Sequence, residues 1–406
     1  MDSTTRMPSR GFALALGLIA LITPLAVHLF MPVIPAVKQA LDLTDAMAQL
    51  TFSIALFGMA FSTLFYGSLS DRYGRRPLLL SGLLLFLAGS VASAFAQTAT
   101  TLVLGRLLQA IGAGCGLTLT RVIARDAYSA QHLVKVFAYL TMFGTLGPMV
   151  SPFIGGVLID TLGWRSVFGF ALVAGGAITI IAYVFMYETH PLAKRSKGGE
   201  SVAQSYAALF RRPRFNAFVL QSGFNTGAFM VMATASASLM TELLHRPATE
   251  FGLYFVLFPI GFFLGNLISS RVGNRVAGET MVLIGSMLAM VTVAGQAFVL
   301  SYGPLTPLAY FIPGAFITMA QGIALPYAMV GAMAEVPRFA GTAAGVSVFM
   351  QNFFAAFFAQ LYGFLADGSP RPMIMIALLC GLLILSTGSM PFLLKRFRAG
   401  PAPPIP

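Results

Sequence analysis

The chain has 406 residues, of which 57% are hydrophobic and 9% are charged, and its mean hydropathy is +0.82. Soluble globular proteins carry about 25% charged residues, and disordered chains combine few apolar residues with much charge. The composition therefore excludes both classes. A helix that crosses a bilayer needs about 20 apolar residues, so a polytopic membrane protein is the class that remains.

Twelve apolar runs follow one another along the chain, and each is long enough for a membrane-spanning helix. The first six lie at 11–37, 47–70, 78–96, 101–124, 135–158 and 166–187. After a polar, basic stretch come six more, at 215–241, 250–270, 280–301, 305–332, 341–366 and 373–394. The first run is too long for the apolar part of a cleavable signal peptide, so we interpret it as the first membrane helix.

This layout predicts an all-α polytopic membrane protein with 12 transmembrane helices in two six-helix bundles. We expect an N-terminal bundle over 1–187, a cytoplasmic basic linker over 188–214, a C-terminal bundle over 215–394 and a cytoplasmic tail over 395–406. An internal echo supports the two-fold repeat. Arg72, Gly74 and Arg76 close the second run, and Arg271, Gly273 and Arg275 close the eighth, 199 residues further along, so a short basic turn with the same spacing recurs at the same place in both halves.

The distribution of basic residues predicts the orientation. With the N-terminus inside, 19 of the 25 lysine and arginine residues fall in inner segments and four in outer segments. Basic loops stay on the cytoplasmic side of membranes, so both termini are expected there. The same bias accounts for the formal net charge of +12 without a nucleic-acid partner. Cys115 and Cys380 both lie in apolar runs and are expected to pack as small hydrophobic residues.

Ionisable side chains inside the predicted membrane spans are few. None of the 13 acidic residues lies in the middle of a run, which leaves His28, Arg106 and Arg121. A histidine titrates near neutral pH, so His28 could exchange a proton. The alternative is a neutral histidine that is hydrogen-bonded to a neighbouring helix. Prolines at positions 24, 32 and 35 are expected to distort the helix around it.

Arg106 is predicted to lie several residues inside the fourth span. A guanidinium group cannot lose its proton, so it needs hydrogen-bond acceptors within the membrane. We expect these acceptors to be backbone carbonyls, Gln109, water or a substrate. The alternative is a structural role in which Arg106 holds helices together.

A cluster of glycine and proline residues occupies the fifth run. Small residues let helices approach closely, and prolines bend them. The cluster therefore predicts a packing surface and hinge rather than a ligand site, and its members are Gly144, Gly147, Pro148, Pro152, Gly155 and Gly156.

Motifs for enzymatic chemistry are missing from the sequence. It contains no G-x-x-x-x-G-K-[ST] motif for ATP, no His/Cys set with metal-ligand spacing and no recognisable Ser-His-Asp arrangement. We therefore expect no enzyme activity, no metal and no cofactor.

Four motifs together resemble the major facilitator superfamily. The stretch from Gly67 to Pro77 resembles its signature between the second and third helices, and Arg106 with Gln109 and Gly112 resembles its fourth-helix motif. Gly147-Pro148 with Gly155-Gly156 resembles the fifth-helix motif of its drug:proton antiporters. The residues 121–126 and 163–168 are similar to the bicyclomycin-resistance (Bcr/CflA) branch. The residues that carry the first resemblance are Gly67, Asp71, Arg72, Gly74, Arg75 and Arg76.

The resemblance implies a transporter of the bacterial cytoplasmic membrane that works by alternating access, uses the proton gradient, needs no cofactor and is a monomer. Asp71, Arg75 and Asp126 would form a cytoplasmic charge cluster that latches the outward-open state. The branch commonly has an aspartate where this chain has His28, four residues before Pro32. If that aspartate is the proton site, coupling in this chain runs through His28 or is altered.

Three functions remain open at this stage. The first is proton-coupled export of small, partly apolar compounds such as drugs or antibiotics. The second is transport of one specific metabolite by the same fold, and the third is a membrane receptor or scaffold that transports nothing. Since no mid-span carboxylate would neutralise a strong cation, Arg106 and Arg121 suit neutral, zwitterionic or anionic compounds better. The expected partners are a small-molecule substrate and the lipid bilayer.

Overall fold

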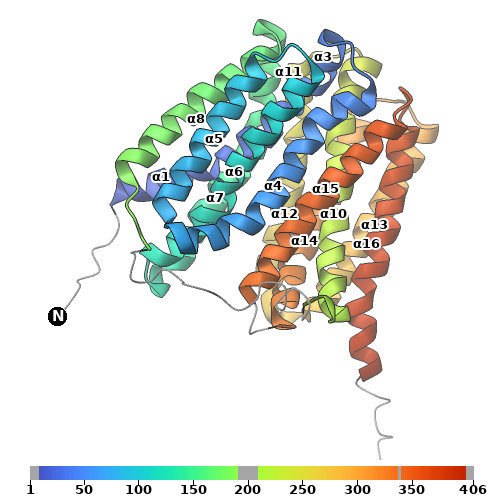
Figure 1. The fold of residues 1–406 in the computed structure, drawn as a ribbon. Helices are drawn as coiled ribbons and strands as arrows, with labels where there is room; N and C mark the ends of the chain where they lie inside the picture. Colours follow the sequence, from blue (N-terminus) through green and yellow to red (C-terminus); the bar gives the residue numbers. More distant parts are fainter. Residues whose placement is uncertain (1–8, 191–208, 337–339, 399–406) are drawn as a thin grey trace, which may run out of the picture. The chain divides into compact units, whose positions relative to one another are not determined.

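The computed structural model describes residues 9–190, 209–336 and 340–398 (Figure 1). These residues form long helices joined by short connections, and the described part of the chain contains no strand, as the sequence predicts. Most of the predicted linker at 188–214 and the end of the predicted tail lie outside the described residues. The chain divides into two compact units, which are Met1–Gly199 with Arg246–Leu253, and Glu200–His245 with Tyr254–Pro406.

The described residues 9–190 form six helical segments at the predicted places. The first of them is broken, because Pro24, Pro32 and Pro35 each lack a backbone N–H group that a continuous helix needs. It consists of α1 (Arg10–Ala20), α2 (Ile22–Val27), the 3₁₀-helix η1 (His28–Phe30) and α3 (Val33–Ala40). The others are α4 (Asp45–Tyr73), α5 (Arg75–Ala94), α6 (Ala99–Ala127), α7 (Ala130–Leu162) and α8 (Arg165–Phe185).

The described residues from 213 onward repeat the pattern of six. The first of these six segments is α10 (Pro213–Ser238), which continues into the π-helix η3 (Leu239–Leu243). The next is divided at Val256 into α11 (Ala248–Phe255) and α12 (Leu257–Val272), followed by η4 (Gly273–Arg275). The remaining ones are α13 (Gly278–Tyr302), α14 (Pro307–Ala334), α15 (Ala340–Leu365) and α16 (Arg371–Arg398). Most of α11, up to Leu253, therefore belongs to the first unit, whereas α12 belongs to the second.

Eleven helices among the described residues are long and apolar enough to cross a membrane. Helix α10, at the seventh predicted position, is not among them, because it carries the polar residues Gln221, Asn225 and Thr234. All three are buried against neighbouring helices of the second unit. A helix surrounded by protein needs no continuous apolar surface, so α10 completes the twelve-helix pattern as a buried helix.

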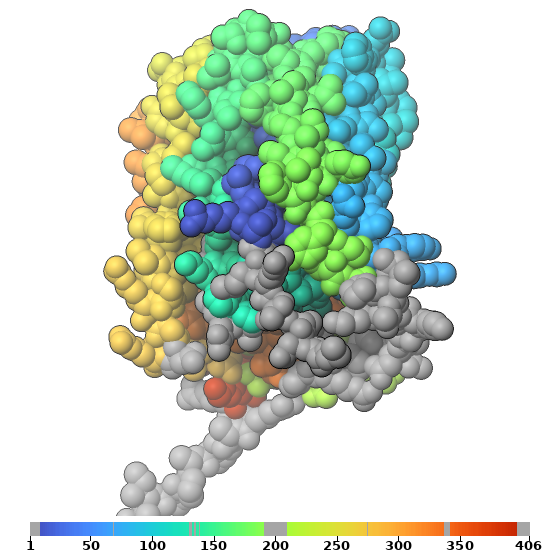
Figure 2. Space-filling model, turned by 90° about the vertical axis from the view of Figure 1, so that its left-hand side faces the viewer, coloured from blue at the N-terminus to red at the C-terminus, as the bar shows by residue number. Residues whose placement is uncertain are grey.

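Helices on the outside of a unit present apolar side chains to the bilayer. Figure 2 shows α8, with α1 beside it, and α1 packs against both α7 and α8. On α8, Val173 is 74% exposed and Ile180 is 66% exposed. Large apolar side chains exposed in this way are expected where lipid tails cover the surface.

Glycines bring helices α5 and α6 into direct backbone contact. A methyl group added to Gly89 would lie 2.2 Å from the backbone nitrogen of Gln109, and one added to Gly112 would lie 2.3 Å from that of Phe86. Helices in membranes associate through such close approaches of small residues. This contact fixes the position of Gln109 along the axis of α6 relative to α5. It therefore also fixes the position of Arg106, which lies one turn before Gln109.

Candidate functional site

Arg106 lies inside the first unit and is 1% exposed. Its Nε donates a hydrogen bond to the carbonyl oxygen of Thr51 on α4 at 3.2 Å, and its Nη1 donates to Oε1 of Gln109. The guanidinium carbon lies 4.1 Å from the centre of the Phe30 ring, a cation–π contact. The site thus contains two of the acceptor types that the sequence suggests, together with an aromatic ring that it does not.

Gln109 extends this arrangement to a third helix. Its Nε2 donates to the hydroxyl oxygen of Ser90 on α5 at 2.8 Å, and Ser90 donates in turn to the carbonyl of Phe86. The guanidinium therefore connects α4, α5 and α6 with the 3₁₀ turn that breaks the first helix. We refer to Arg106, Gln109, Ser90, Thr51 and Phe30 as the arginine network.

The arginine network contains no carboxylate. None of the ion pairs found among the described residues involves Arg106, and its Nη2 is buried without a hydrogen-bond partner in that part of the chain. A cation inside a membrane protein is costly when it is unpaired, and such residues usually face an interior pathway and serve a function. The arrangement can therefore accept one further hydrogen-bond acceptor at Nη2.

His28 and Arg121 differ in their surroundings. His28 begins the turn that ends at Phe30, and its Nδ1 is buried with no hydrogen-bond partner among the described residues. Arg121 is exposed on α6, 15 residues after Arg106 and thus about 22 Å along the helix axis. The structure brings Arg106 and Gln109 together and places His28 in the same 3₁₀ turn as Phe30, but Arg121 lies apart from the network.

Arg75 is the centre of a second site, at the cytoplasmic end of the first unit. Its side chain is 3% exposed and forms ion pairs with Asp71 at 2.7 Å and with Asp126 at 2.9 Å. Its Nη1 also donates to the hydroxyl of Ser70. The three charged residues that the sequence places at the inner ends of α4, α5 and α6 are therefore in contact.

The start of α5 is held by a residue that the sequence analysis missed. Gly74 has a φ of +99°, a conformation that suits glycine, and it has no side chain to cap the helix. Glu188, after α8, accepts hydrogen bonds from the backbone N–H groups of Arg75 at 2.9 Å and of Arg76 at 3.3 Å. The sequence shows that Glu188 is a charged residue directly after an apolar run. It does not show that this carboxylate binds the start of α5.

The remaining residues of the signature stretch have smaller roles in the structure. Arg76 donates from Nη2 to the carbonyl of Tyr183 at 2.9 Å. Arg72 lies with its guanidinium carbon 5.4 Å from the centre of the Tyr73 ring. Gly67 has open space where a methyl group would lie, so packing does not require glycine there.

The glycine–proline cluster of α7 consists mostly of contact points. A methyl group on Gly147 would lie 2.3 Å from Pro24, and one on Gly155 would lie 2.5 Å from the carbonyl oxygen of Leu29. Gly156 approaches the carbonyl of Ala248 in the same way, whereas Gly144 faces open space. Helix α7 continues through Pro148 and Pro152. The contacts agree with a packing surface, and a hinge here stays a prediction.

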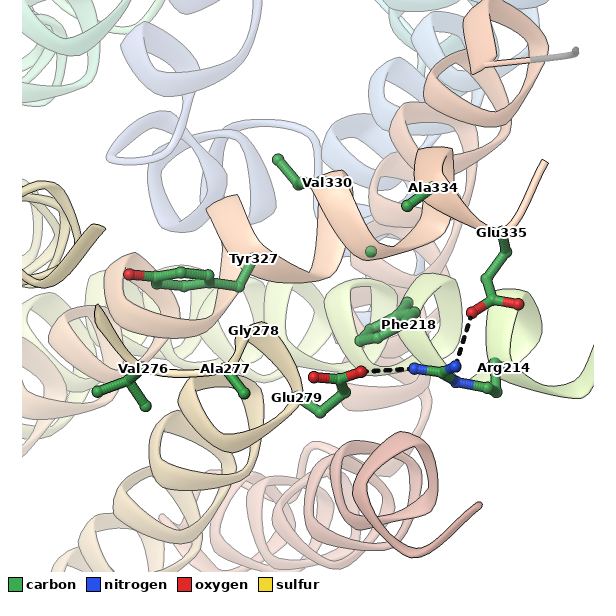
Figure 3. Close-up of a pocket in the computed structure, with 11 residues that line it drawn as sticks. Arg214, Phe218, Val276, Ala277, Gly278, Glu279, Tyr327, Val330, Ala334 and Glu335 are labelled. Atoms are coloured by element: carbon green, nitrogen blue, oxygen red, sulfur yellow. Dashed lines mark hydrogen bonds and ion pairs between the residues drawn. The ribbon is translucent and has the colours of Figure 1, made fainter. Parts of the chain in front are cut away.

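A further charged cluster, at the cytoplasmic end of the second unit, was not predicted (Figure 3). Arg214 at the start of α10 pairs with Glu279 at 2.6 Å and with Glu335 at 3.2 Å, and Lys395 pairs with Glu279 at 3.3 Å. Beside it lies a cavity of about 280 Å³ that Phe218, Tyr327 and Val330 help to line. The cluster connects α10, α13, α14 and α16.

Buried amides in the second unit were also missed. Gln321 on α14 donates to the hydroxyl of Thr226 on α10 at 3.2 Å. Oδ1 of Asn225 and Oε1 of Gln221 are buried without a hydrogen-bond partner among the described residues. The low hydropathy of the seventh run was the signal for these polar contacts.

Comparison with known proteins identifies the family. Residues 16–360 match the model of the Major Facilitator Superfamily. The chain is 27% identical to "Multidrug resistance protein D" of Escherichia coli (strain K12), over 91% of this chain and 93% of that one. It is 24% identical to "Bicyclomycin resistance protein homolog" of Haemophilus influenzae, over 82% of this chain and 83% of that one.

A solved structure shows the same fold. A bacterial homolog of the human lysosomal transporter Spinster, in an inward-facing and unoccupied conformation, matches with a TM-score of 0.75 at 15% identity and covers 100% of both chains. The family resemblance that the four motifs predict is therefore confirmed. The chain belongs to the Major Facilitator Superfamily and is a multi-pass transporter of the inner membrane, not an enzyme.

Proposed function

We propose that this transporter exports small, partly apolar compounds, including drugs, in exchange for protons and by alternating access. Two of its relatives are named for resistance to multiple drugs and to bicyclomycin. The observation that supports the proposal most directly is the arginine network. A permanent cation that is 1% exposed and has a free Nη2 is connected to the break in the first helix.

The arginine network also supports a proposal for the coupled proton. His28 and Phe30 lie in one 3₁₀ turn, and the Phe30 ring covers the guanidinium of Arg106. A proton on His28 would add a second positive charge near this turn, which Coulomb repulsion disfavours. Proton binding and release at His28 would therefore change the contact between this turn and the arginine network. This change supplies a physical link between the proton and the geometry of the first helix.

The same charges bear on the choice of substrate. The free Nη2 of Arg106 is a hydrogen-bond donor, and no carboxylate contacts the network in the described part of the chain. Such a site suits compounds that carry a hydrogen-bond acceptor and are neutral, zwitterionic or anionic, and it disfavours strong cations. Uptake of a lipophilic cation that the His28→Ala variant loses would contradict this preference.

The cytoplasmic charge cluster gives alternating access a candidate gate. Arg75 joins Asp71 and Asp126 across three helix ends. An exposed ion pair contributes little, but the Arg75 side chain is 3% exposed. We propose that the cluster stabilises the state open to the outside relative to the state open to the inside, and so biases the equilibrium between them.

The experiment that tests the exchange uses inverted membrane vesicles with a preset inside-acid pH gradient. Chloramphenicol-like, quinolone-like and lipophilic cationic compounds are added to vesicles that contain the parent or the His28→Ala variant. Collapse of the gradient that depends on a compound and is lost in the variant supports exchange through His28. The matched control is His132→Ala, because His132 lies at the start of α7, where its Nδ1 contacts Ser129 at 3.0 Å.

The other outcomes separate the alternatives. Collapse that survives in His28→Ala assigns the proton to another group. No response to any compound favours a carrier of one specific metabolite, or one that is not coupled to protons. A protein that transports nothing would also tolerate Arg106→Ala without loss of function.

A further inference from the structure

The cavity of about 280 Å³ at the cytoplasmic end of the second unit has two kinds of wall (Figure 3). Its apolar wall includes the ring of Phe218 on α10 and Val330 on α14. Its polar wall consists of Arg214, Glu279 and Glu335, which are joined by ion pairs. All the residues found to line the cavity belong to the second unit. The site therefore needs no residue of the first unit.

The apolar wall is held in shape by contacts behind it. The hydroxyl of Tyr327 donates to the carbonyl oxygens of Ser269 at 3.1 Å and of Gly273 at 2.8 Å, and these bonds fix the tyrosine ring beside the cavity. Phe218 is 2% exposed, and a methyl group on Gly331 would lie 2.7 Å from its ring. The walls are thus formed before a ligand arrives, so binding requires little ordering of side chains.

The charges of the polar wall are paired with one another. Arg214 contacts Glu279 at 2.6 Å and Glu335 at 3.2 Å. Lys395 contacts the second carboxylate oxygen of Glu279 at 3.3 Å. Two positive and two negative charges therefore cancel, and the side chains of Arg214 and the two glutamates are only between 15% and 20% exposed. An anion in the cavity would compete for Arg214 and a cation would compete for the carboxylates, whereas a neutral compound disturbs neither ion pair.

The size of the cavity limits the size of its ligand. Sites for small molecules usually have volumes of about 300–1,000 Å³ and mostly apolar walls. A cavity of about 280 Å³ therefore suits a compound with one aromatic ring and a short chain. The ring would lie against Phe218 and Tyr327, because aromatic rings attract one another. The uncharged polar end, such as an amide, would lie toward the polar wall.

Access to the cavity is open at its edge. Val330 lines the cavity and is 61% exposed, and Ala277 and Ala334 are exposed as well. A compound can therefore reach the cavity from the surface at the cytoplasmic end without the movement of a helix.

We propose that this cavity is a binding subsite for neutral compounds with one aromatic ring and an uncharged polar end, and that such compounds bind there first on their way out of the cell. The subsite rests on the proposed export function and narrows its substrate class. The arginine network provides one place for a substrate in the first unit, and the cavity provides an earlier one in the second unit.

The first test measures binding without transport. A single reporter, Ala334→Cys, is made in a Cys115→Ala, Cys380→Ala background of the full chain, because Ala334 is exposed at the cavity. Its alkylation by a maleimide is measured in detergent at rising concentrations of phenylbutyramide, a neutral probe. An affinity on the order of 1 mM is expected for so small a compound. Alkylation should therefore slow by about fivefold or more at about 10 mM.

Two charged analogues test the paired charges of the polar wall. Phenylbutyrate resembles the amide but carries a negative charge, and phenylbutylamine carries a positive one. Each should need a concentration about fivefold higher or more for the same protection, since each competes with an ion pair. The control reporter is Arg271→Cys, at an exposed position near the end of α12 that does not line the cavity. Equal protection by all three compounds, or equal protection of Arg271→Cys, overturns the subsite.

The second test fills the cavity. Val330→Trp places a large ring in this space, and because Val330 is 61% exposed, the core stays undisturbed. The variant should lose the protection of Ala334→Cys. For a neutral compound that collapses the pH gradient, it should raise the half-saturating concentration by about fivefold or more and leave the maximal rate unchanged. The matched control is Val291→Trp, which is 68% exposed on α13 and about 20 Å along the axis from the start of that helix.

The outcomes separate this subsite from the proposed function. Absence of protection by phenylbutyramide, or a half-saturating concentration that Val330→Trp leaves unchanged or that Val291→Trp raises equally, overturns the subsite. Because the protection assay needs neither a gradient nor transport, protection without any compound-dependent collapse of the gradient would contradict the proposed exchange. The same result would support the cavity as a binding site.

Discussion

Gly89→Ala is expected to destabilise the first unit, because this glycine sets the distance between α5 and α6. The added methyl group would lie 2.2 Å from the backbone nitrogen of Gln109 and 2.6 Å from its Cα. The closer contact is about 1.2 Å short of ordinary van der Waals separation. Because the atoms it meets are backbone atoms, the helices must move apart.

The magnitude follows from two opposing effects. Overpacking of a well-packed interior costs about 1–3 kcal/mol, and alanine is favoured over glycine in a helix by about 1 kcal/mol. Because the methyl group meets backbone atoms that cannot rotate away, the cost is expected in the upper half of that range, about 2–3 kcal/mol. The net loss is then about 1–2 kcal/mol, which corresponds to a fall in the unfolding midpoint of about 2–8 °C. The movement also carries Gln109 away from Ser90, so transport should fall together with stability.

The assay is thermal unfolding in detergent, followed with a dye that fluoresces when it reacts with thiols. Cys115 and Cys380 are both 0% exposed, so they react only when the protein opens. The control is Gly176→Ala on α8, where a methyl group meets nothing within 4 Å. A midpoint of Gly89→Ala equal to that of the parent, or an equal fall for Gly176→Ala, would refute this account of the helix contact.

Three other substitutions test the charged and polar contacts. Arg75→Gln leaves two carboxylates without their cation. Breaking a buried ion pair costs about 3–5 kcal/mol, and since the Asp71 side chain is 51% exposed, a loss of about 2–3 kcal/mol is expected in the same thermal assay. Arg72→Gln should have little effect, and equal unfolding midpoints for the two variants would contradict the cluster. Arg106→Lys keeps the charge but loses the planar donor geometry, so compound-dependent collapse of the pH gradient should slow by about tenfold or more, and a parental rate would argue against the network. Tyr310→Phe removes a buried hydrogen bond of 2.7 Å to the carbonyl of Met232 and should lower stability by about 1 kcal/mol. The control is Tyr302→Phe at an exposed position, which should not change stability measurably. Equal unfolding midpoints for the two variants would contradict a stabilising role of this hydrogen bond.

Much of the fold could be predicted from the sequence, because a bilayer imposes a simple rule on composition. Apolar runs of about 20 residues give the spans, and prolines at 24, 32 and 35 predict the distorted first helix that the structure shows. The seventh helix tests the limit of this rule. It was found from its length and position, although its hydropathy is too low for a lipid-exposed span.

The sites could be predicted less completely, because a side chain's partners depend on which helices pack together. The sequence suggested Gln109 and a carbonyl as acceptors for Arg106, since Gln109 lies one helical turn away. It could not identify Thr51 or Phe30, which come from other helices. Glu188 was missed for the same reason, as its carboxylate accepts backbone hydrogen bonds from a distant segment.

The polar character of α10 has a consequence for how the protein is made. Its buried face packs against α14, α15 and α16, all of which follow it in the sequence. During synthesis α10 therefore reaches the membrane before any of these partners exists. A helix with buried glutamine and asparagine side chains inserts poorly into lipid by itself. Insertion of α10 must therefore depend on its translocation machinery or on a temporary protein neighbour until the last helix is complete.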